Sequence, residues 1–261
     1  MKKNYKLLAT LVLSGLAGAA FGVLPAEAAV TVRSADGTEK SLTETEFTSL
    51  YGNKYMDSTS GNTVSISGEG TVTLKGETVS LGGLSYTAST LAGAYALESG
   101  DASNNKLSVT DGASVSFSNA TDNWIAGGIS IAGGISMKGA ASGNQVTLSG
   151  VSLNLPDAIT SSLKIAGGVS ASASASGNTV TLSNSTAQSS DIYGGYGYME
   201  YYGDTSAEAD AGVNHNTVTL TNSTAQSSDI YGGYGYMEYY GDTSAEADAG
   251  VNWCGFVNTD K

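Results

Sequence analysis

The sequence predicts an all-β protein, specifically a β-solenoid in which parallel strands stack repeat upon repeat. Three observations predict this class. Apolar residues alternate with period two along most of the chain, a motif that begins with Asn recurs at intervals of 34 to 43 residues, and a 38-residue unit is present twice with two differences, as residues 178–215 and 216–253. Such alternation is typical of half-buried strands, and a long period is typical of stacked repeats.

The first 28 residues predict a secretory signal peptide. Three lysines precede an apolar run over residues 7–24, and residues 26–28 (Ala-Glu-Ala) have the small-residue pattern of a cleavage site. An uncleaved membrane anchor is the alternative, because about 18 apolar residues can just span a bilayer. Glycines within the run and Pro25 weaken such a helix, so we expect cleavage after Ala28 or Ala29 and export of the remainder.

The composition of the chain argues against nucleic acid as a partner and against an internal disulfide as a source of stability. The chain has 24 acidic and 11 basic residues and a formal net charge of −13. An acidic protein repels phosphate backbones, so nucleic acid is not an expected partner. Cys254 is the single cysteine, so stability must come from packing and hydrogen bonds. Abundant small residues would also fit a disordered chain, but disorder predicts no hydrophobic periodicity.

Residues 29–60 precede the first complete repeat, and we expect them to form an N-terminal cap. The nearest approach to a helical apolar stripe after the signal peptide, Leu42–Tyr55, lies within this region. No other stretch beyond residue 28 keeps such a stripe over a useful length.

Residues 61–252 form the predicted repeat domain, in which two motifs interleave. The first is Asn-x-(Val/Leu)-(Ser/Thr)-apolar. It begins at Asn62, Asn105, Asn144, Asn178 and Asn216. The second is an apolar residue, Ala or Tyr, and Gly-Gly. It begins at Ile125, Ile131, Ile165, Ile192 and Ile230, with a weaker relative at Leu91.

Stacking these units in register predicts which residues lie over one another. One repeat has too few apolar residues to close a core, whereas neighbours about 4.8 Å apart would form apolar ladders. We expect the pairs Val180 with Val218, Leu182 with Leu220, Ile192 with Ile230, and an amide ladder that includes Asn178 and Asn216. We expect the Gly-Gly pairs at sharp bends where no side chain fits. Whether each unit forms one large rung or two small ones stays open.

The pattern from Gly177 to Asn214, with its Asn-Thr-Val-Thr-Leu and Ile-Tyr-Gly-Gly units and Ala/Gly/Ser-rich loops, resembles repeat-rich passenger domains of bacterial autotransporters. The likeness covers about residues 61–252. It implies a right-handed parallel β-helix displayed outside the cell, and attachment to the outer membrane through a C-terminal β-barrel. The chain would then be found at the cell surface, in the outer membrane or in the extracellular space.

Residues 253–261 depart from this pattern. A further unit should continue as Asn214-His215-Asn216 does, but the chain reads "WCGFVNTDK". Our hypothesis is a frameshift or assembly break that separates the repeats from the barrel that the resemblance implies. The alternative is a genuine short C-terminal cap.

The sequence gives little support to catalysis. Basic residues are scattered, and His215 is replaced by Trp253 in the sister unit, so we expect no enzyme activity and no cofactor. Loop acids at Glu200, Asp204, Glu208 and Asp210 could bind calcium, but the nonapeptide of calcium-binding β-rolls is missing, and we favour solvated loops. We interpret the sequons that begin at Asn119, Asn184 and Asn222 as chance matches.

The tyrosines are the most suggestive surface feature. Ten of the 15 lie in the two near-identical units, and stacking would align them in rows. Rigid amphipathic rings suit contact with proteins or sugars, although alternate members could instead fill the wall. We expect Tyr193 and Tyr231 to be structural. The ligand-contact candidates are Tyr196, Tyr198, Tyr201, Tyr202, Tyr234, Tyr236, Tyr239 and Tyr240.

These observations predict a non-catalytic, adhesin-like passenger domain that contacts a protein or glycan on a host or neighbouring cell. An extracellular β-helix carbohydrate-active enzyme and a passive spacer are the alternatives. The enzyme would need convergent acids in a groove, and the spacer would need a binding domain elsewhere in the protein.

Overall fold

A computed structural model describes most of the chain that follows the predicted signal peptide. Of residues 1–28, only Ala28 lies within the described part. The described residues are 28–81, 84–97, 100–117, 129–154, 163–188, 190–202, 209–210, 212–226, 229–240, 247–248, 251–252 and 255–258.

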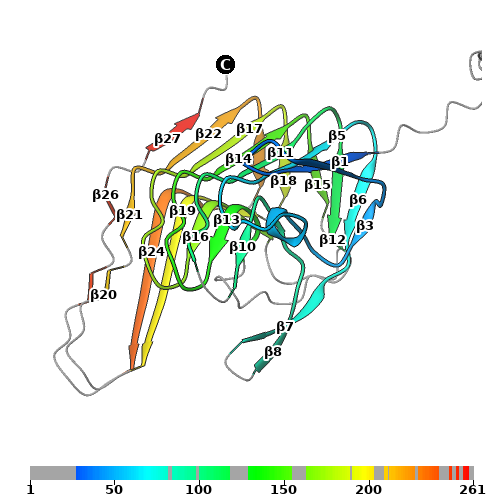
Figure 1. Cartoon of the computed structure of the whole chain (residues 1–261). Helices are drawn as coiled ribbons and strands as arrows, with labels where there is room; N and C mark the ends of the chain where they lie inside the picture. The colour runs from blue at the N-terminus through cyan, green and yellow to red at the C-terminus, as the bar shows by residue number, and fades with distance from the viewer. Residues whose placement is uncertain are drawn as a thin grey trace, which may run out of the picture.

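Three sheets organise these residues, and the first, sheet A, has eight strands. From β5 onward its strands are parallel and follow chain order, as Figure 1 shows along the top of the molecule. In spatial order, the strands of sheet A are β2 (Glu39–Leu42), β1 (Ala29–Arg33), β5 (Thr63–Ser67), β11 (Lys106–Val109), β14 (Gln145–Ser149), β17 (Thr179–Ser183), β22 (Thr217–Thr221) and β27 (Gly255–Asn258).

Sheets B and C are parallel throughout. Sheet B contains β3 (Glu46–Phe47), β6 (Thr71–Leu74), β12 (Ser114–Phe117), β15 (Ser152–Asn154), β18 (Thr186–Gln188) and β23 (Thr224–Gln226). Sheet C contains β4 (Leu50–Tyr51), β9 (Leu91–Ala92), β10 (Tyr95–Ala96), β13 (Ile129–Ser136), β16 (Leu163–Ser170), β19 (Ser190–Tyr202) and β24 (Ile230–Tyr240).

Each sequence repeat contributes strands to the sheets in the order A, B, C, one to each sheet, except that the first repeat contributes both β9 and β10 to sheet C. We number the repeats by these strands: repeat 1 has β5, β6 and β9; repeat 2 has β11, β12 and β13; repeat 3 has β14, β15 and β16; repeat 4 has β17, β18 and β19; and repeat 5 has β22, β23 and β24. The predicted all-β class with parallel sheets is confirmed. A repeat therefore has three main strands, one in each sheet, so each unit corresponds to a single passage of the chain through the three sheets.

Several short strands lie outside sheets A, B and C. The strands β7 (Glu77–Leu81) and β8 (Leu84–Ala88) form an antiparallel hairpin that projects away from the sheets (Figure 1). Two short parallel pairs follow the long strands of sheet C, β20 (Ala209–Asp210) with β25 (Ala247–Asp248) and β21 (Val213–Asn214) with β26 (Val251–Asn252). The described residues contain one helical element, the 3-10 turn η1 (Gly52–Lys54), and no helix there has the length and apolarity to cross a membrane.

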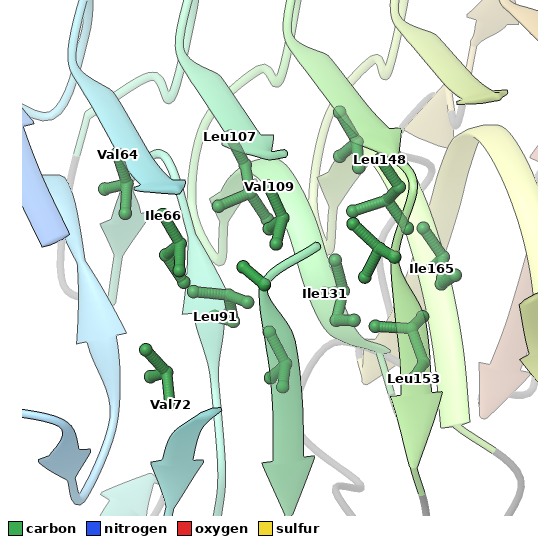
Figure 2. Packing of buried hydrophobic residues seen from close by; sticks show 14 of the residues in the cluster. Val64, Ile66, Val72, Leu91, Leu107, Val109, Ile131, Leu148, Leu153 and Ile165 are labelled. Atoms are coloured by element: carbon green, nitrogen blue, oxygen red, sulfur yellow. The ribbon is translucent and has the colours of Figure 1, made fainter. Parts of the chain in front are cut away.

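The repeats are in register, and the core lies between the sheets. Val180 pairs with Val218, Leu182 with Leu220, and Ile192 with Ile230, so the predicted apolar ladders are confirmed. In β17 every second residue is buried, because the pleat turns Val180 and Leu182 inward and the threonines outward. Figure 2 shows the equivalent side chains of repeats 1 to 3 meeting in one interior. Each such Val, Leu or Ile contributes roughly 1.5–3 kcal/mol when it is buried.

The predicted cap region, residues 29–60, begins all three sheets. Strand β1 pairs antiparallel with both β2 and β5, whereas β3 and β4 start sheets B and C in the parallel direction. Leu42–Tyr55 contains β3, β4 and η1 instead of a longer helix. The outermost strand, β2, exposes Glu39 and Lys40, and charges of this kind keep other strands from pairing with a sheet edge.

Residues 255–258 of the C-terminal tail continue sheet A. Strand β27 pairs parallel with β22, and Phe256 lies beside Val218. The same register places Asn258 beside Leu220, where a continuing repeat would place an apolar residue. The tail therefore departs from the repeats in residue type while its described backbone keeps their register.

Candidate functional site: the asparagine and tyrosine ladders

A ladder of five buried asparagines runs along the start of sheet A. It consists of Asn62, Asn105, Asn144, Asn178 and Asn216, and each side chain is fully buried. The Oδ1 atom of each residue from Asn105 onward accepts a hydrogen bond from the backbone N–H of the asparagine one repeat earlier, at 2.8 or 2.9 Å. The predicted pairing of Asn178 with Asn216 is confirmed, and it is one step of a longer ladder.

The amides of Asn144 and Asn178 in this ladder are saturated, as Asn144 illustrates. Its Oδ1 accepts from the N–H of Asn105 at 2.9 Å and from Nδ2 of Asn105 at 3.2 Å. Its Nδ2 donates to the carbonyl of Ala102 at 2.7 Å and to Oδ1 of Asn178 at 3.1 Å. Buried polar groups destabilise a protein unless they are hydrogen-bonded, and here each asparagine supplies the partners of its neighbours. The ladder therefore fixes the register of adjacent repeats.

The glycine pairs of the second motif fit against this ladder. A Cβ atom on Gly134 would lie 2.5 Å from Oδ1 of Asn144, and a Cβ on Gly168 would overlap Asn178 in the same way. The expectation that no side chain fits there is confirmed, but the expected sharp bend is corrected. Gly134 and Gly168 lie inside β13 and β16, and the neighbouring asparagine amide is what excludes a side chain.

Left-handed backbone conformations flank the strands of sheet A. The residue before each ladder asparagine has a positive φ: Gly61 (76°), Asn104 (58°), Gly143 (68°), Gly177 (66°) and His215 (55°). His215 is exposed and occupies a turn position that favours glycine or asparagine. Its place is thus explained by the turn, with no role in chemistry required.

The sequon asparagines Asn184 and Asn222 occupy the second such corner, between sheets A and B. Both are exposed, with φ of 50° and 48°. The next residue, Ser185, is buried, and its Oγ donates to the carbonyl of Leu148 at 3.1 Å. The left-handed backbone conformation thus explains the asparagines, and burial with a hydrogen bond explains the serine that follows Asn184. Asn119 lies outside the described residues.

The tyrosines of repeats 4 and 5 stack in two rows on the face of sheet C opposite the main core. Tyr193 and Tyr231 are 5.7 Å apart and nearly parallel, and Tyr196 and Tyr234 are 5.4 Å apart and nearly parallel. Tyr193 also contacts Tyr196 edge-on. The rows continue a cluster of Ala and aliphatic residues from the earlier repeats, so the face of sheet C behind the core is also packed.

Burial differs between the two repeats. Tyr193 is 5% exposed and Tyr196 is 6% exposed, whereas Tyr231 is 39% exposed and Tyr234 is partly buried. Tyr193 is structural, as expected, but the burial of Tyr196 differs from the exposure expected of a ligand contact, because Tyr234 stacks on it. Burial and the nearby Asp191 raise the pKa of Tyr193, and its hydroxyl donates to Asp191 Oδ2 at 3.4 Å.

The remaining tyrosine candidates are aligned by the backbone. Tyr198 pairs with Tyr236, Tyr201 with Tyr239, and Tyr202 with Tyr240 along β19 and β24. Their side chains lie outside the described part of the structure. The acidic positions follow the same register, since Glu200 pairs with Glu238 and Asp210 with Asp248, while Asp204 and Glu208 lie outside the described residues. Within the described residues, no group of three or more His, Cys, Asp and Glu could hold a metal ion.

A second tyrosine pair at the opposite end of sheet C was not predicted. Tyr51 and Tyr95 meet edge to face with centroids 5.6 Å apart. Lys54 lies 5.4 Å from the Tyr51 ring centre and forms an ion pair with Glu77 at 3.0 Å. Burial raises the pKa of Tyr51 to about 12, and burial also raises that of Tyr95. The weak repeat at Leu91 was the available sequence signal, because it places Tyr95 in the column of Tyr196 and Tyr234.

Comparison of the chain with protein-family models, curated proteins and solved structures gives no match.

Proposed function

We propose that this protein is an exported, adhesin-like passenger domain displayed at the cell surface, and that its repeats form a right-handed parallel β-helix. The observation that carries the proposal is the register of repeats 1 to 5, which pair strand by strand in all three sheets. A stack of this kind is rigid and extends by one strand spacing per repeat, about 4.8 Å. A rigid, extended stack suits projection from a cell surface and contact with other cells more than it suits catalysis.

The outward side chains of sheet A support a role at a wet surface. One column across five repeats consists of Ser65, Ser108, Thr147, Thr181 and Thr219, all partly exposed. These hydroxyl groups are uncharged and hydrated, and the net charge of −13 disfavours contact with other acidic surfaces at low salt. The predicted signal peptide supplies the route of export.

Surface labelling of intact cells tests the display. An epitope inserted between Leu81 and Leu84, the paired ends of β7 and β8, would lie on the hairpin that projects from the sheets in Figure 1. We expect antibody to label intact cells and external protease to remove the label. A variant that lacks residues 2–28 is the matched control and should remain unlabelled. Labelling of the complete chain only after permeabilisation contradicts the proposal.

Adhesion is tested separately from display. Cells that display the chain should bind host or neighbouring cells more strongly than cells that display a variant without residues 178–215, which removes one tyrosine-rich unit and keeps the other. If both variants reach the surface equally and neither promotes binding, the adhesin-like role is contradicted.

A passive spacer is the second candidate, and the burial of Tyr196 favours it. In this case the tyrosine rows hold neighbouring repeats together, and the chain acts by its length. Removal of one unit would then leave binding unchanged as long as the rest of the surface stays within reach. Release of sugar from polysaccharide by the purified chain would instead revive the enzyme alternative.

A further inference from the structure

The outward face of sheet A carries side chains in a regular two-dimensional array. Because the strands of repeats 1 to 5 pair in register, equivalent residues form columns across the sheet, as the strands along the top of Figure 1 show. The middle column consists of Ser65, Ser108, Thr147, Thr181 and Thr219, and every member is partly exposed. A hydroxyl group therefore recurs at each step through the five repeats.

Hydroxyl groups also occupy most of the two flanking columns in repeats 3 to 5. In β14 the middle and last outward residues carry a hydroxyl, and Gln145 is the exception. In the next two strands all six outward residues carry one, and all are partly exposed: Thr179, Thr181 and Ser183 in β17, and Thr217, Thr219 and Thr221 in β22. The outward face of these three strands is thus uncharged, although the chain has a formal net charge of −13.

Two features hold these hydroxyl groups at regular distances. Threonine is branched at Cβ and has a restricted χ1 angle, so the backbone largely fixes the position of its hydroxyl group. The buried asparagine ladder keeps adjacent strands in register, and side-chain ladders of this kind favour a flat sheet over a twisted one. Neighbouring members of a column are then about 4.8 Å apart, and alternate residues of one strand are roughly 6.6 Å apart.

Oxygen atoms on the prism face of hexagonal ice repeat along two perpendicular directions, with periods close to these two distances. We propose that the outward face of sheet A binds the surface of an ice crystal, through water molecules that the serine and threonine hydroxyl groups of repeats 3 to 5 hold in order. A single glycan chain could use one column, whereas a repeat in two directions matters only to a ligand that is itself periodic in two directions. The inference is independent of the proposed cell-surface role.

The chemistry of this face suits a lattice of water more than it suits an ion or a charged polymer. A hydroxyl group both donates and accepts hydrogen bonds, so it can take the place of a lattice water in either role. Charged side chains would hold water in hydration shells of their own, and β14, β17 and β22 place none on this face. Because the hydroxyl groups are positioned before binding, little rotamer freedom is lost when the ordered water bridges them to the crystal.

Slow growth of ice in a stirred solution of the purified chain tests the proposal, and the measurement is the fraction of protein that enters the ice. We expect the wild type to enter the ice and a bystander protein of similar size and charge to be excluded. Thr181→Lys, at the centre of the array, should reduce entry to the level of the bystander. Ser152→Lys, at an exposed position of β15 in sheet B, is the matched control and should behave as the wild type. Exclusion of the wild type, or an equal loss in both variants, overturns the proposal.

The shape of single ice crystals covers the case in which Thr181→Lys fails to fold, which circular dichroism detects. Crystals held just below the melting temperature should develop facets in the wild-type protein and remain rounded in Thr219→Lys, which alters the same column one repeat further along. Rounded crystals in the wild-type protein contradict the proposal. Binding of the wild type to crystalline cellulose without entry into ice would assign the face to a glycan lattice and overturn it as well.

Discussion

Repeats 4 and 5 have almost the same sequence and different surroundings. Residues 178–215 and 216–253 differ at two positions, yet Ile192 is fully buried and Ile230 is partly exposed, and Tyr193 is 5% exposed while Tyr231 is 39% exposed. The difference teaches that burial in this molecule comes from the neighbouring repeat. Identical side chains therefore contribute unequally to stability according to their place in the stack.

An acidic substitution in the apolar ladder should give the largest difference between the two repeats. We expect Ile192→Asp to destabilise by about 3–5 kcal/mol or to prevent folding, because it places an unpaired charge in the core. Ile230→Asp should destabilise by about 1–2 kcal/mol, since the partly exposed site lets the carboxylate stay hydrated. Urea unfolding followed by circular dichroism measures both. Equal losses would argue against burial by the neighbour.

An asparagine in the middle of the ladder, Asn178, should contribute more to stability than the first one, Asn62. Asn178→Ala leaves the backbone N–H of Asn144 without its acceptor and removes one hydrogen bond each from Nδ2 of Asn144 and from the carbonyl of Ala141, and we expect a loss of about 2–4 kcal/mol. Oδ1 of Asn62 accepts no hydrogen bond from the described groups, so Asn62→Ala should cost about 1 kcal/mol. The free energy of unfolding distinguishes them, and a larger loss at Asn62 would contradict the ladder.

The tyrosine of repeat 4, Tyr193, should also contribute more to stability than its equivalent in repeat 5, Tyr231. Tyr193→Ala removes a ring that contacts Tyr196, Tyr231 and Tyr234, and we expect a loss of about 3 kcal/mol. Tyr231→Ala removes a ring with one face in solvent and should cost about 1 kcal/mol. Thermal unfolding measures both variants. A greater effect at Tyr231 would indicate that the exposed ring has a structural partner.

Alkaline pH should lower the stability of the folded chain through its packed tyrosines. The pKa of Tyr51 is raised to about 12, and those of Tyr95 and Tyr193 are also raised. Unfolded tyrosines lose their protons near pH 10, so the folded chain holds more protons above that pH, and stability falls as pH rises from about 10 toward 12. Stability should be flat just below pH 10 as far as these groups are concerned. Replacing all three by Phe should reduce the alkaline decline, and an unchanged decline would assign it to other groups.

The turn before each ladder asparagine gives the smallest expected effect. His215 and Gly177 hold equivalent positions with φ of 55° and 66°. We expect His215→Gly to stabilise by a few tenths to about 1 kcal/mol and Gly177→His to destabilise by a similar amount, because glycine adopts this conformation without strain. Chemical denaturation of the two variants checks the signs, and opposite signs would mean that His215 makes a contact beyond the turn.

The repeat period of the sequence correctly predicted which residues of neighbouring repeats lie beside one another. The columns of Val180 with Val218 and Asn178 with Asn216 follow from a 38-residue shift, so they could be predicted without coordinates. The antiparallel pairing of β1 with β5 could not, because it depends on how the chain enters the stack. The burial of Tyr196 was also missed, since both its neighbours in the column, Val169 and Tyr234, lie in other repeats.

The glycine pairs illustrate the same limit. Their spacing indicated positions without room for a side chain, but the group that takes that room, the amide of the next ladder asparagine along the chain, is identified only by the three-dimensional packing. For the candidate site, the sequence aligned the tyrosines correctly along β19 and β24, and it could not say which rings are covered.

Deletion of residues 178–215 tests most directly the claim that neighbouring repeats supply the burial. The deletion joins repeat 3 to repeat 5, so Val218 should meet Val146 and Ile230 should meet Ile165 in the register that Val180 and Ile192 now hold. We predict a folded protein that unfolds in urea in one cooperative transition, with a lower dependence on denaturant because less surface is buried. Loss of cooperative unfolding would contradict the account, since an interchangeable unit could then not be what holds the sheets together.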